Sequence, residues 1–240
     1  MMEPTTALAV AVSAGANKAI EKTTANFIEK ISLKFAKDKL EVISFILNKG
    51  LPTYLQANYA KCETLKTLLN RNDPIKLEEC FVAPDFNLRG GKVSSEIFLD
   101  EVNQAADKVI ITGLAGSGKS VFLKYAFRQV LEKGHTYYPI FFELRSLNRS
   151  ERKKDLLLHE IFNSINSYCE TFTQTQFNHG LKSGAFYFLL DGFDELSQSI
   201  RDQVADEISE ISKKNNACAM LVALLHKSAA DRTSPFPGQI

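Results

Sequence analysis

Hydrophobic residues recur with a helical period over the first part of the chain, from about Ala7 to Leu69. The apolar stripes consist of Ile20, Phe27, Ile28, Ile31 and Phe35, followed by Leu40, Ile43, Ile46 and Leu47. Charged residues fill the other faces, and the glycine and proline within 48–52 are typical of a helix end. This pattern predicts an α-helical N-terminal domain over residues 1–75. The sequence leaves open whether this domain only packs on the core or binds a signalling partner.

Residues 76–107 form a predicted linker and lead-in to the main domain. Within it, residues 80–84 have the character of an extended apolar segment, and the glycines of 87–91 predict a flexible bend. Ser95 is expected to cap a helix over 96–103, because a serine before an apolar-periodic run offers an acceptor to the first helical turn.

From residue 108 to residue 225, short apolar runs alternate with helical patterns. Strands are predicted at 109–112, 137–144, 185–190 and 217–225, and helices at 121–131, 155–168, 173–181 and 197–213. Strands that alternate with helices predict an α/β fold with a parallel sheet and flanking helices. Residues 226–240 lack periodicity and carry two prolines, which predicts a disordered tail.

Composition and charge change this picture little. The formal net charge of +1 offers no global field for nucleic acid or a membrane surface. The charged run at 148–154 has no interleaved aromatic residue and predicts a solvated loop. Four cysteines lie far apart without a Cys-x-x-Cys pair, which favours a reducing compartment. No segment has the length of a membrane span, and the first residues lack the positive charge of a signal peptide, so we expect a cytoplasmic protein.

The first candidate chemistry follows the predicted strand at 109–112. Gly113 is followed, after four residues, by Gly118, Lys119 and Ser120, which is the spacing of a phosphate-binding P-loop. The glycines let backbone N–H groups turn toward phosphate oxygens, Lys119 would reach the β- and γ-phosphates, and the Ser120 hydroxyl would hold Mg²⁺. A chance match in a flexible loop is the alternative, and the flanking strand and helix patterns disfavour it. The predicted nucleotide-binding residues are Gly113, Leu114, Ala115, Gly116, Ser117, Gly118, Lys119, Ser120 and Val121.

The second candidate chemistry lies where the predicted strand at 185–190 ends. Ligands of open α/β sheets bind at the carboxyl ends of the strands, so Asp191 is placed to hold Mg²⁺. Asp194 and Glu195 are candidates to orient and polarise an attacking water. The alternative is that these acids only favour the first turn of a following helix. We prefer the first interpretation because the two motifs together complete one site.

The two motifs resemble those of the NACHT family of signal-transducing P-loop NTPases, which belong to the STAND class. The resemblance rests on GLAGSGKS at 113–120, on FLLDGFDEL at 188–196 and on YPIFFELR at 138–145. A softer similarity to bacterial NACHT proteins of antiphage defence lies in residues 59–69 and 81–84. The resemblance covers residues 54–222 and implies a P-loop NTPase sheet of the ASCE/STAND type.

By position, the resemblance implies ATP and Mg²⁺ as ligands. Gly116, Gly118, Lys119 and Ser120 would hold ATP, with Lys119 counted among the catalytic residues. Ser120 and Asp191 would hold Mg²⁺, and hydrolysis would be assisted by Asp194 and Glu195. Members of the family resemble switches that exchange ADP for ATP and then oligomerise. No Asn-Lys-x-Asp guanine-reading motif occurs, which favours adenine.

The end of the sequence departs from the family pattern. The resemblance implies a sheet order of 2-3-4-1, with the P-loop strand at an edge, and a sensor motif of the Thr-Ser-Arg kind after the last strand. Residues 223–226 read Ala-Leu-Leu-His instead. The expectation is therefore a shifted reading frame or premature end from about Ala223, with weak ATP turnover. The alternative function is a non-catalytic NACHT fragment that acts through protein–protein contacts, with itself or with a longer relative.

Overall fold

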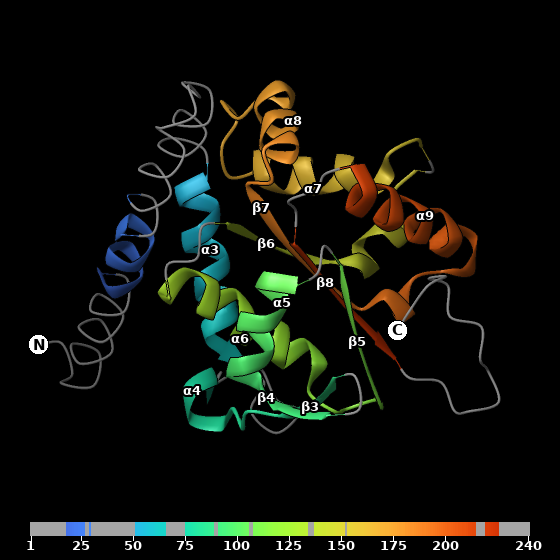
Figure 1. Cartoon of the computed structure of the whole chain (residues 1–240). Coiled ribbons are helices and arrows are strands. Elements are labelled where there is room, and N and C mark those ends of the chain that lie inside the picture. Colours follow the sequence, from blue (N-terminus) through green and yellow to red (C-terminus); the bar gives the residue numbers. More distant parts are fainter. Residues whose placement is uncertain are drawn as a thin grey trace, which may run out of the picture.

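The structure is a computed structural model that describes residues 18–26, 29, 51–65, 75–88, 91–105, 108–133, 137–151, 153–214 and 219–225. A central sheet carries helices on both faces (Figure 1). In this described part of the chain, none of the helices combines the length and the apolar character that a membrane crossing requires. Most of the predicted N-terminal stripes beyond Ile20, and the predicted tail at 226–240, lie outside the described residues.

The central sheet has four strands, and every neighbouring pair is parallel. The strands are β5 (Val109–Gly113), β6 (Tyr138–Glu143), β7 (Phe186–Asp191) and β8 (Ala219–Leu225). Their order is β5-β8-β7-β6, which is the 2-3-4-1 order that the resemblance implies. Among the described strands, β5 and β6 are the edges. The predicted parallel sheet is present, and β7 has five buried residues before Asp191 because it is covered on both faces.

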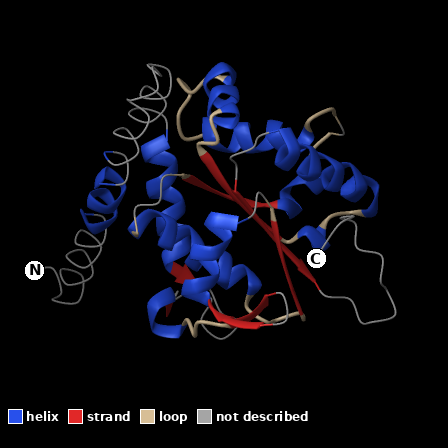
Figure 2. Ribbon diagram, in the orientation of Figure 1, coloured by secondary structure: helices blue, strands red, loops and turns tan. Residues whose placement is uncertain are grey.

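Four helices flank this sheet. They are α6 (Lys119–Glu132), α7 (Leu156–Asn166), α8 (Gln174–Lys182) and α9 (Gln198–Lys214). Connections between parallel strands are right-handed. The step from β5 to β6 crosses the sheet in one direction and the later steps return, so α6 lies on one face and the other three helices lie on the opposite face (Figure 2). Two 3₁₀ helices follow the strand ends, η3 (Leu144–Arg149) after β6 and η4 (Phe193–Glu195) after β7.

Helix α3 (Leu51–Glu63) packs beside α6 and shares one hydrophobic core with the sheet. Its buried residues recur three and four apart: Leu51, Tyr54, Leu55, Asn58, Tyr59 and Cys62. The Tyr54 hydroxyl donates to the Phe141 carbonyl at 3.1 Å, and the Tyr59 hydroxyl donates to Glu132 Oε1 at 2.6 Å. The predicted domain boundary near residue 75 stays a prediction, but α3 is bonded directly to elements beyond it.

Two short pairings interrupt the predicted helical and linker regions. The helix expected to run through Leu69 ends at Glu63, because β1 (Thr64–Leu65) pairs antiparallel with β2 (Ile75–Lys76). The expected bend at 87–91 belongs to a hairpin of β3 (Asp85–Leu88) and β4 (Gly91–Ser94). The sequence did not predict this hairpin, since each strand has only four residues and the hairpin is held by a distant contact, the stacking of Phe86 on Phe98 at 4.1 Å.

The helices near the hairpin also differ from expectation. Between β2 and β3 lies α4 (Leu77–Cys80), and α5 (Ser95–Ala105) follows β4. The predicted cap of α5 was Ser95, but Ser94 Oγ accepts from the Ile97 N–H at 3.4 Å. Ser95 Oγ instead donates to the Pro84 carbonyl at 2.5 Å and ties α5 to the segment before the hairpin.

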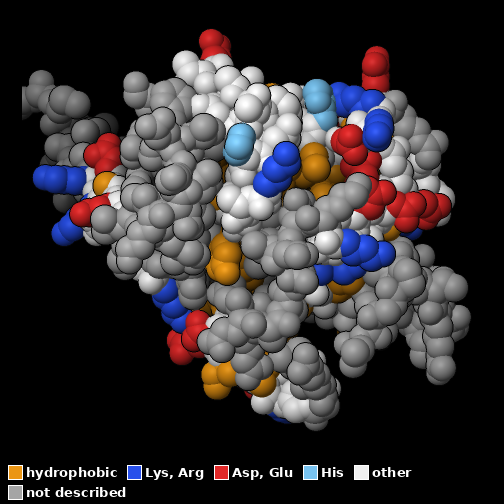
Figure 3. Space-filling model, turned by 45° about the horizontal axis from the view of Figure 1, so that its top comes forward, with side chains coloured by type: hydrophobic (Ala, Val, Ile, Leu, Met, Phe, Trp, Pro, Cys, Tyr) orange, Lys and Arg blue, Asp and Glu red, His pale blue; other side chains and the backbone are white. Residues whose placement is uncertain are grey.

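The predicted solvated loop at 148–154 begins inside η3, and its described residues beyond Arg149 are irregular. The face of the molecule in Figure 3 carries α7 and α8, and its acidic and basic side chains are interspersed. The local charge pattern therefore agrees with the even balance of charge in the sequence.

Candidate nucleotide and magnesium site

The P-loop, residues Gly113–Ser120, joins the end of β5 to the start of α6. Gly116 and Gly118 have φ angles of 76° and 83°, a left-handed conformation that side chains with a Cβ rarely adopt. A Cβ at Gly113 would lie 2.7 Å from Ser117 Oγ. The glycines of the motif are thus required by the shape of the loop itself, and Leu114, Ala115, Gly116, Ser117 and Gly118 are exposed along it.

Lys119 lies folded over this loop. Its Nζ donates to the Gly113 carbonyl at 2.9 Å and to the Leu114 carbonyl at 2.8 Å, with Ser117 Oγ at 3.4 Å. An ammonium group has three donors, and the loop accepts all three, the longest bond being the one to Ser117 Oγ. A phosphate oxygen would therefore replace one of these bonds, of which the bond to Ser117 is the weakest. The loop and its lysine therefore form a cradle that fits a phosphate chain.

The two predicted motifs meet at the end of β7. Ser120 Oγ donates to Asp191 Oδ1 at 2.8 Å, although the two residues are 71 positions apart in sequence. Among the described residues, no group of three or more His, Cys, Asp or Glu could hold a metal ion. Mg²⁺ is usually held by one or two protein oxygens together with phosphate oxygens and water. Ser120 and Asp191 offer such a pair, so the residues present fit this ion.

The surroundings of Asp191 raise its pKa above the ordinary value. Burial is the largest cause, and the charges of Glu143 and Glu195 act in the same direction. The hydrogen bond from Ser120 and the charge of Lys124 act in the opposite direction. A partly buried carboxylate with other negative charges nearby is stabilised in its ionised form by a cation, which is the electrostatic condition for a metal ligand.

Asp194 and Glu195 lie in η4, directly after the β7 end. Gly192 begins this turn with a φ of 74°, and a Cβ there would lie 3.1 Å from Glu195 Oε1. The backbone of η4 is held from two sides: Arg201 Nη2 donates to the Asp194 carbonyl at 3.1 Å, and Asn148 Nδ2 donates to the Glu195 carbonyl at 2.9 Å. The tight turn thus holds the backbone of both predicted acids at the carboxyl end of the sheet, directly after Asp191.

The structure adds two charged residues that the sequence analysis did not assign to the site. Glu143 is the register partner of Asp191 on the neighbouring strand β6. Arg145 Nη2 donates to Glu143 Oε2 at 2.7 Å, and Arg145 Nη1 lies 3.9 Å from Glu195 Oε2. The only available signal was the apolar run that ends in Glu-Leu-Arg at 143–145, at the same kind of strand end as Asp191.

Comparison with known families agrees with this geometry. A family model for the NACHT domain matches residues 107–235, which is more than half of the 240 residues. No curated protein matches the chain. The matched stretch includes the P-loop, β6 and the Asp191–Glu195 segment. NACHT domains are nucleoside triphosphatase domains, and they bind nucleotide with Mg²⁺. The chain belongs to the NACHT family.

Proposed function

We propose that this chain binds ATP with Mg²⁺ at the P-loop and Asp191, and acts as a nucleotide-dependent signalling switch with slow hydrolysis. The observation that carries the proposal is the 2.8 Å hydrogen bond between Ser120 and Asp191, which brings the two motifs into one site. The resemblance to bacterial defence proteins further suggests a cytoplasmic role in antiphage defence. This biological setting rests on the resemblance alone.

In this proposal, different residues of the chain bind the phosphates and the Mg²⁺ ion of the nucleotide. The P-loop backbone surrounds the phosphates, and Lys119 contributes a fixed positive charge from above the loop. Ser120 and Asp191 hold Mg²⁺, which when bound neutralises charge on the phosphate oxygens. Phosphoryl transfer depends mainly on positioning and electrostatics, so the preformed loop is the main contribution of the fold.

Hydrolysis requires a water positioned on the γ-phosphate side. Glu195 and Asp194 supply carboxylates beside Asp191, and Arg145 lies between Glu143 and Glu195. We propose that Glu195 accepts the proton of the attacking water while Asp194 orients it. Because Arg145 and Glu195 are both half exposed, their ion pair is weak and can open when nucleotide binds.

The binding proposal is tested by calorimetric titration of ATP with Mg²⁺ into the wild-type chain and the Lys119→Ala variant. Hydrogen bonds to charged groups contribute about 1.5–3 kcal/mol, so we expect affinity to fall at least about tenfold in Lys119→Ala. Lys182→Ala on α8 removes an exposed lysine of a different helix and is the matched control. Equal affinity in Lys119→Ala and wild type would overturn the proposal.

The catalytic part of the proposal has its own test. Glu195→Gln keeps the shape of the side chain but removes the base. General-base catalysis contributes about 10²–10⁴-fold, so phosphate release should fall by that order while ATP affinity stays within about threefold. Unchanged phosphate release in Glu195→Gln would reject Glu195 as the base and leave the binding proposal intact.

A further inference from the structure

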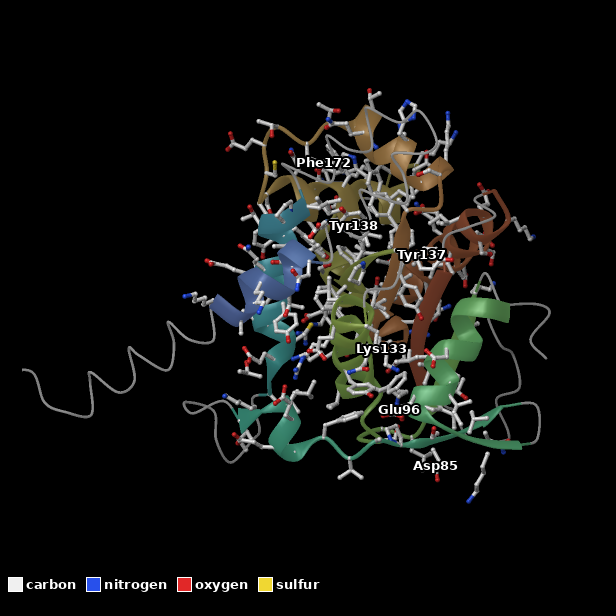
Figure 4. All side chains as sticks on the ribbon, turned by 60° about the vertical axis from the view of Figure 1, so that its left-hand side comes forward. Asp85, Glu96, Lys133, Tyr137, Tyr138 and Phe172 are labelled. Atoms are coloured by element: carbon white, nitrogen blue, oxygen red, sulfur yellow. The ribbon has the colours of Figure 1, made fainter. Side chains whose placement is uncertain are left out.

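A cavity lies beside the proposed nucleotide site, along the outer edge of β6. Its volume is about 540 Å³, within the range of small-molecule sites. No P-loop residue lines it, and neither does Asp191. Figure 4 looks onto this side of the molecule, with α3 beside α6 and Tyr138 labelled at the start of β6. We call it the β6 cavity; it is lined by Asn58, Lys61, Cys62, Thr64, Leu65, Lys124, Phe141, Phe142, Glu143, Ser146 and Ser164.

The position of this cavity follows from the way in which β6 ends the sheet. The Tyr138 N–H donates to the Ala185 carbonyl at 2.6 Å, so alternate residues of β6 point their backbone groups toward β7. Pro139, Phe141 and Glu143 therefore present theirs to the outer edge. Tyr54 of α3 bonds the Phe141 carbonyl. Helix α3 thus covers the edge without filling the space beside its last residues.

The side chains that line the β6 cavity carry more positive than negative charge. The only carboxylate in its lining is Glu143, and Arg145 already pairs with Glu143 at 2.7 Å. Lys61 and Lys124 contribute two ammonium groups. Among the described residues, neither has a carboxylate within ion-pair distance. The lining as a whole therefore offers two positive charges that a ligand could neutralise.

Lys61 and Lys124 both line the β6 cavity, and each ammonium group has a different hydrogen-bond partner. Lys124 Nζ has one long hydrogen bond, 3.5 Å to the Thr64 carbonyl, and Lys61 Nζ donates to the Tyr168 hydroxyl at 2.7 Å. Burial raises the pKa of the Cys62 thiol to about 12, and the positive charges of Lys124 and Lys61 both act against this rise. Cys62 is 1% exposed and lines the same cavity as the two lysines.

We propose that the β6 cavity binds a small organic phosphate monoester, with its phosphate between Lys61 and Lys124 and its apolar body against Phe141 and Leu65. A phosphate monoester carries a charge of about −1.5 to −2 at neutral pH, which matches two lysines, whereas a carboxylate matches one. The hydroxyl groups of Thr64 and Ser164 lie in the same lining and supply donors. This site takes a ligand different from the nucleotide proposed for the P-loop, although Glu143 and Lys124 of its lining also act on Asp191.

The test uses phenyl phosphate as the probe and calorimetric titration as the measurement. The full chain carrying Lys119→Ala is used, so that phosphate binding at the P-loop does not contribute. We expect one saturable site, and at least about tenfold weaker binding of benzoate, which has the same ring and one charge. Binding of phenyl phosphate should weaken about tenfold in each of Lys61→Gln and Lys124→Gln.

Lys133→Gln is the matched control, because Lys133 ends α6 and pairs only weakly with Asp100 at 4.0 Å. This variant should bind phenyl phosphate like its parent. Thermal melts of each variant check that the fold is kept, and Ser164→Phe, which fills the cavity without changing its charge, should also abolish binding. Absence of saturable binding, equal binding of benzoate, or binding that is unchanged in the two lysine variants would each overturn the proposal.

Discussion

Strands β6 and β7 lie side by side, and each ends in a carboxylate at the same register, Glu143 and Asp191. Among the described elements, β7 has a strand on each side, whereas β6 has β7 on one side and helix α3 on the other. Asp191 accepts from the P-loop residue Ser120, whereas Glu143 accepts from Arg145, two residues further along its own chain. Both strand ends carry a carboxylate, and the difference between them lies in the residues that surround it.

In the proposed function, Asp191 belongs to the nucleotide site and Glu143 does not because their neighbours differ. The P-loop and α6 lie against the end of β7, and the resulting burial raises the pKa of Asp191. The edge position of β6 instead leaves room for a cavity that contains two lysines. We therefore expect mutations at the two strand ends to have distinct effects, both on stability and on metal binding.

The largest expected effect is on the free energy of unfolding, which should fall more for a substitution in β7 than for one in β6. Phe188 of β7 is 1% exposed, so Phe188→Ala should cost about 3–5 kcal/mol of unfolding free energy. Phe141 of β6 is partly exposed beside the cavity, so the same change there should cost about 1–3 kcal/mol. Urea denaturation of both variants measures the difference. Equal costs would show that the edge strand is packed as tightly as the central one.

The second effect separates the two carboxylates. Asp191→Asn should lower ATP affinity in the presence of Mg²⁺ at least about tenfold, because an amide is a poor ligand for this ion. Glu143→Gln should change the same affinity less than about threefold. Titrations with Mg²⁺ and with a chelator isolate the metal-dependent part. A loss in Glu143→Gln as large as that in Asp191→Asn would mean that both strand ends hold the metal.

The third effect is a pH dependence that belongs to Asp191. Its pKa is raised above 3.8 in the folded protein, and only the ionised form can hold Mg²⁺. The metal-dependent gain in ATP affinity should thus be present at neutral pH and be lost, as pH falls, at a higher pH than an ordinary aspartate would allow. In the control variant Asp191→Asn, the pH dependence of this gain in affinity reports the titration of the ATP phosphates alone. Identical pH profiles for the two proteins would contradict the prediction.

Without Mg²⁺, the contribution of Asp191 to folding stability has the opposite pH dependence. A carboxyl group whose pKa is higher in the folded than in the unfolded state makes folding more favourable at low pH, and this contribution is lost as pH rises through the folded value. Asp191→Asn should therefore keep or raise the melting temperature of the metal-free protein at neutral pH. A clear decrease would show that the hydrogen bond from Ser120 outweighs the cost of burying the charge.

The smallest effect concerns the edge of β6. Tyr54→Phe removes the hydroxyl that bonds the Phe141 carbonyl, and should cost about 0.5–1.5 kcal/mol. Tyr168→Phe removes an exposed hydroxyl that accepts from Lys61, and should cost less. Denaturation curves of the two variants test whether α3 stabilises the sheet edge through this bond.

The sequence predicted β7 and the P-loop well because their signals are local. An unbroken apolar run predicts a strand covered on both faces, and the glycine spacing follows from backbone angles at Gly116 and Gly118. The hairpin of β3 and β4 was missed because its contacts are between distant aromatic rings, such as Phe86 and Phe122. The β6 cavity was equally invisible, since its lining comes from separate elements that only the fold brings together.

The central claim is that Ser120 and Asp191 build one Mg²⁺-dependent nucleotide site. A double-mutant cycle of Ser120→Ala and Asp191→Asn, measured by ATP titration with and without Mg²⁺, tests it most directly. If both residues hold the same ion, each single variant loses the metal-dependent part of the affinity, and the double variant loses little more. Losses that add fully, or affinities that do not depend on Mg²⁺ in any of the four proteins, would contradict the claim.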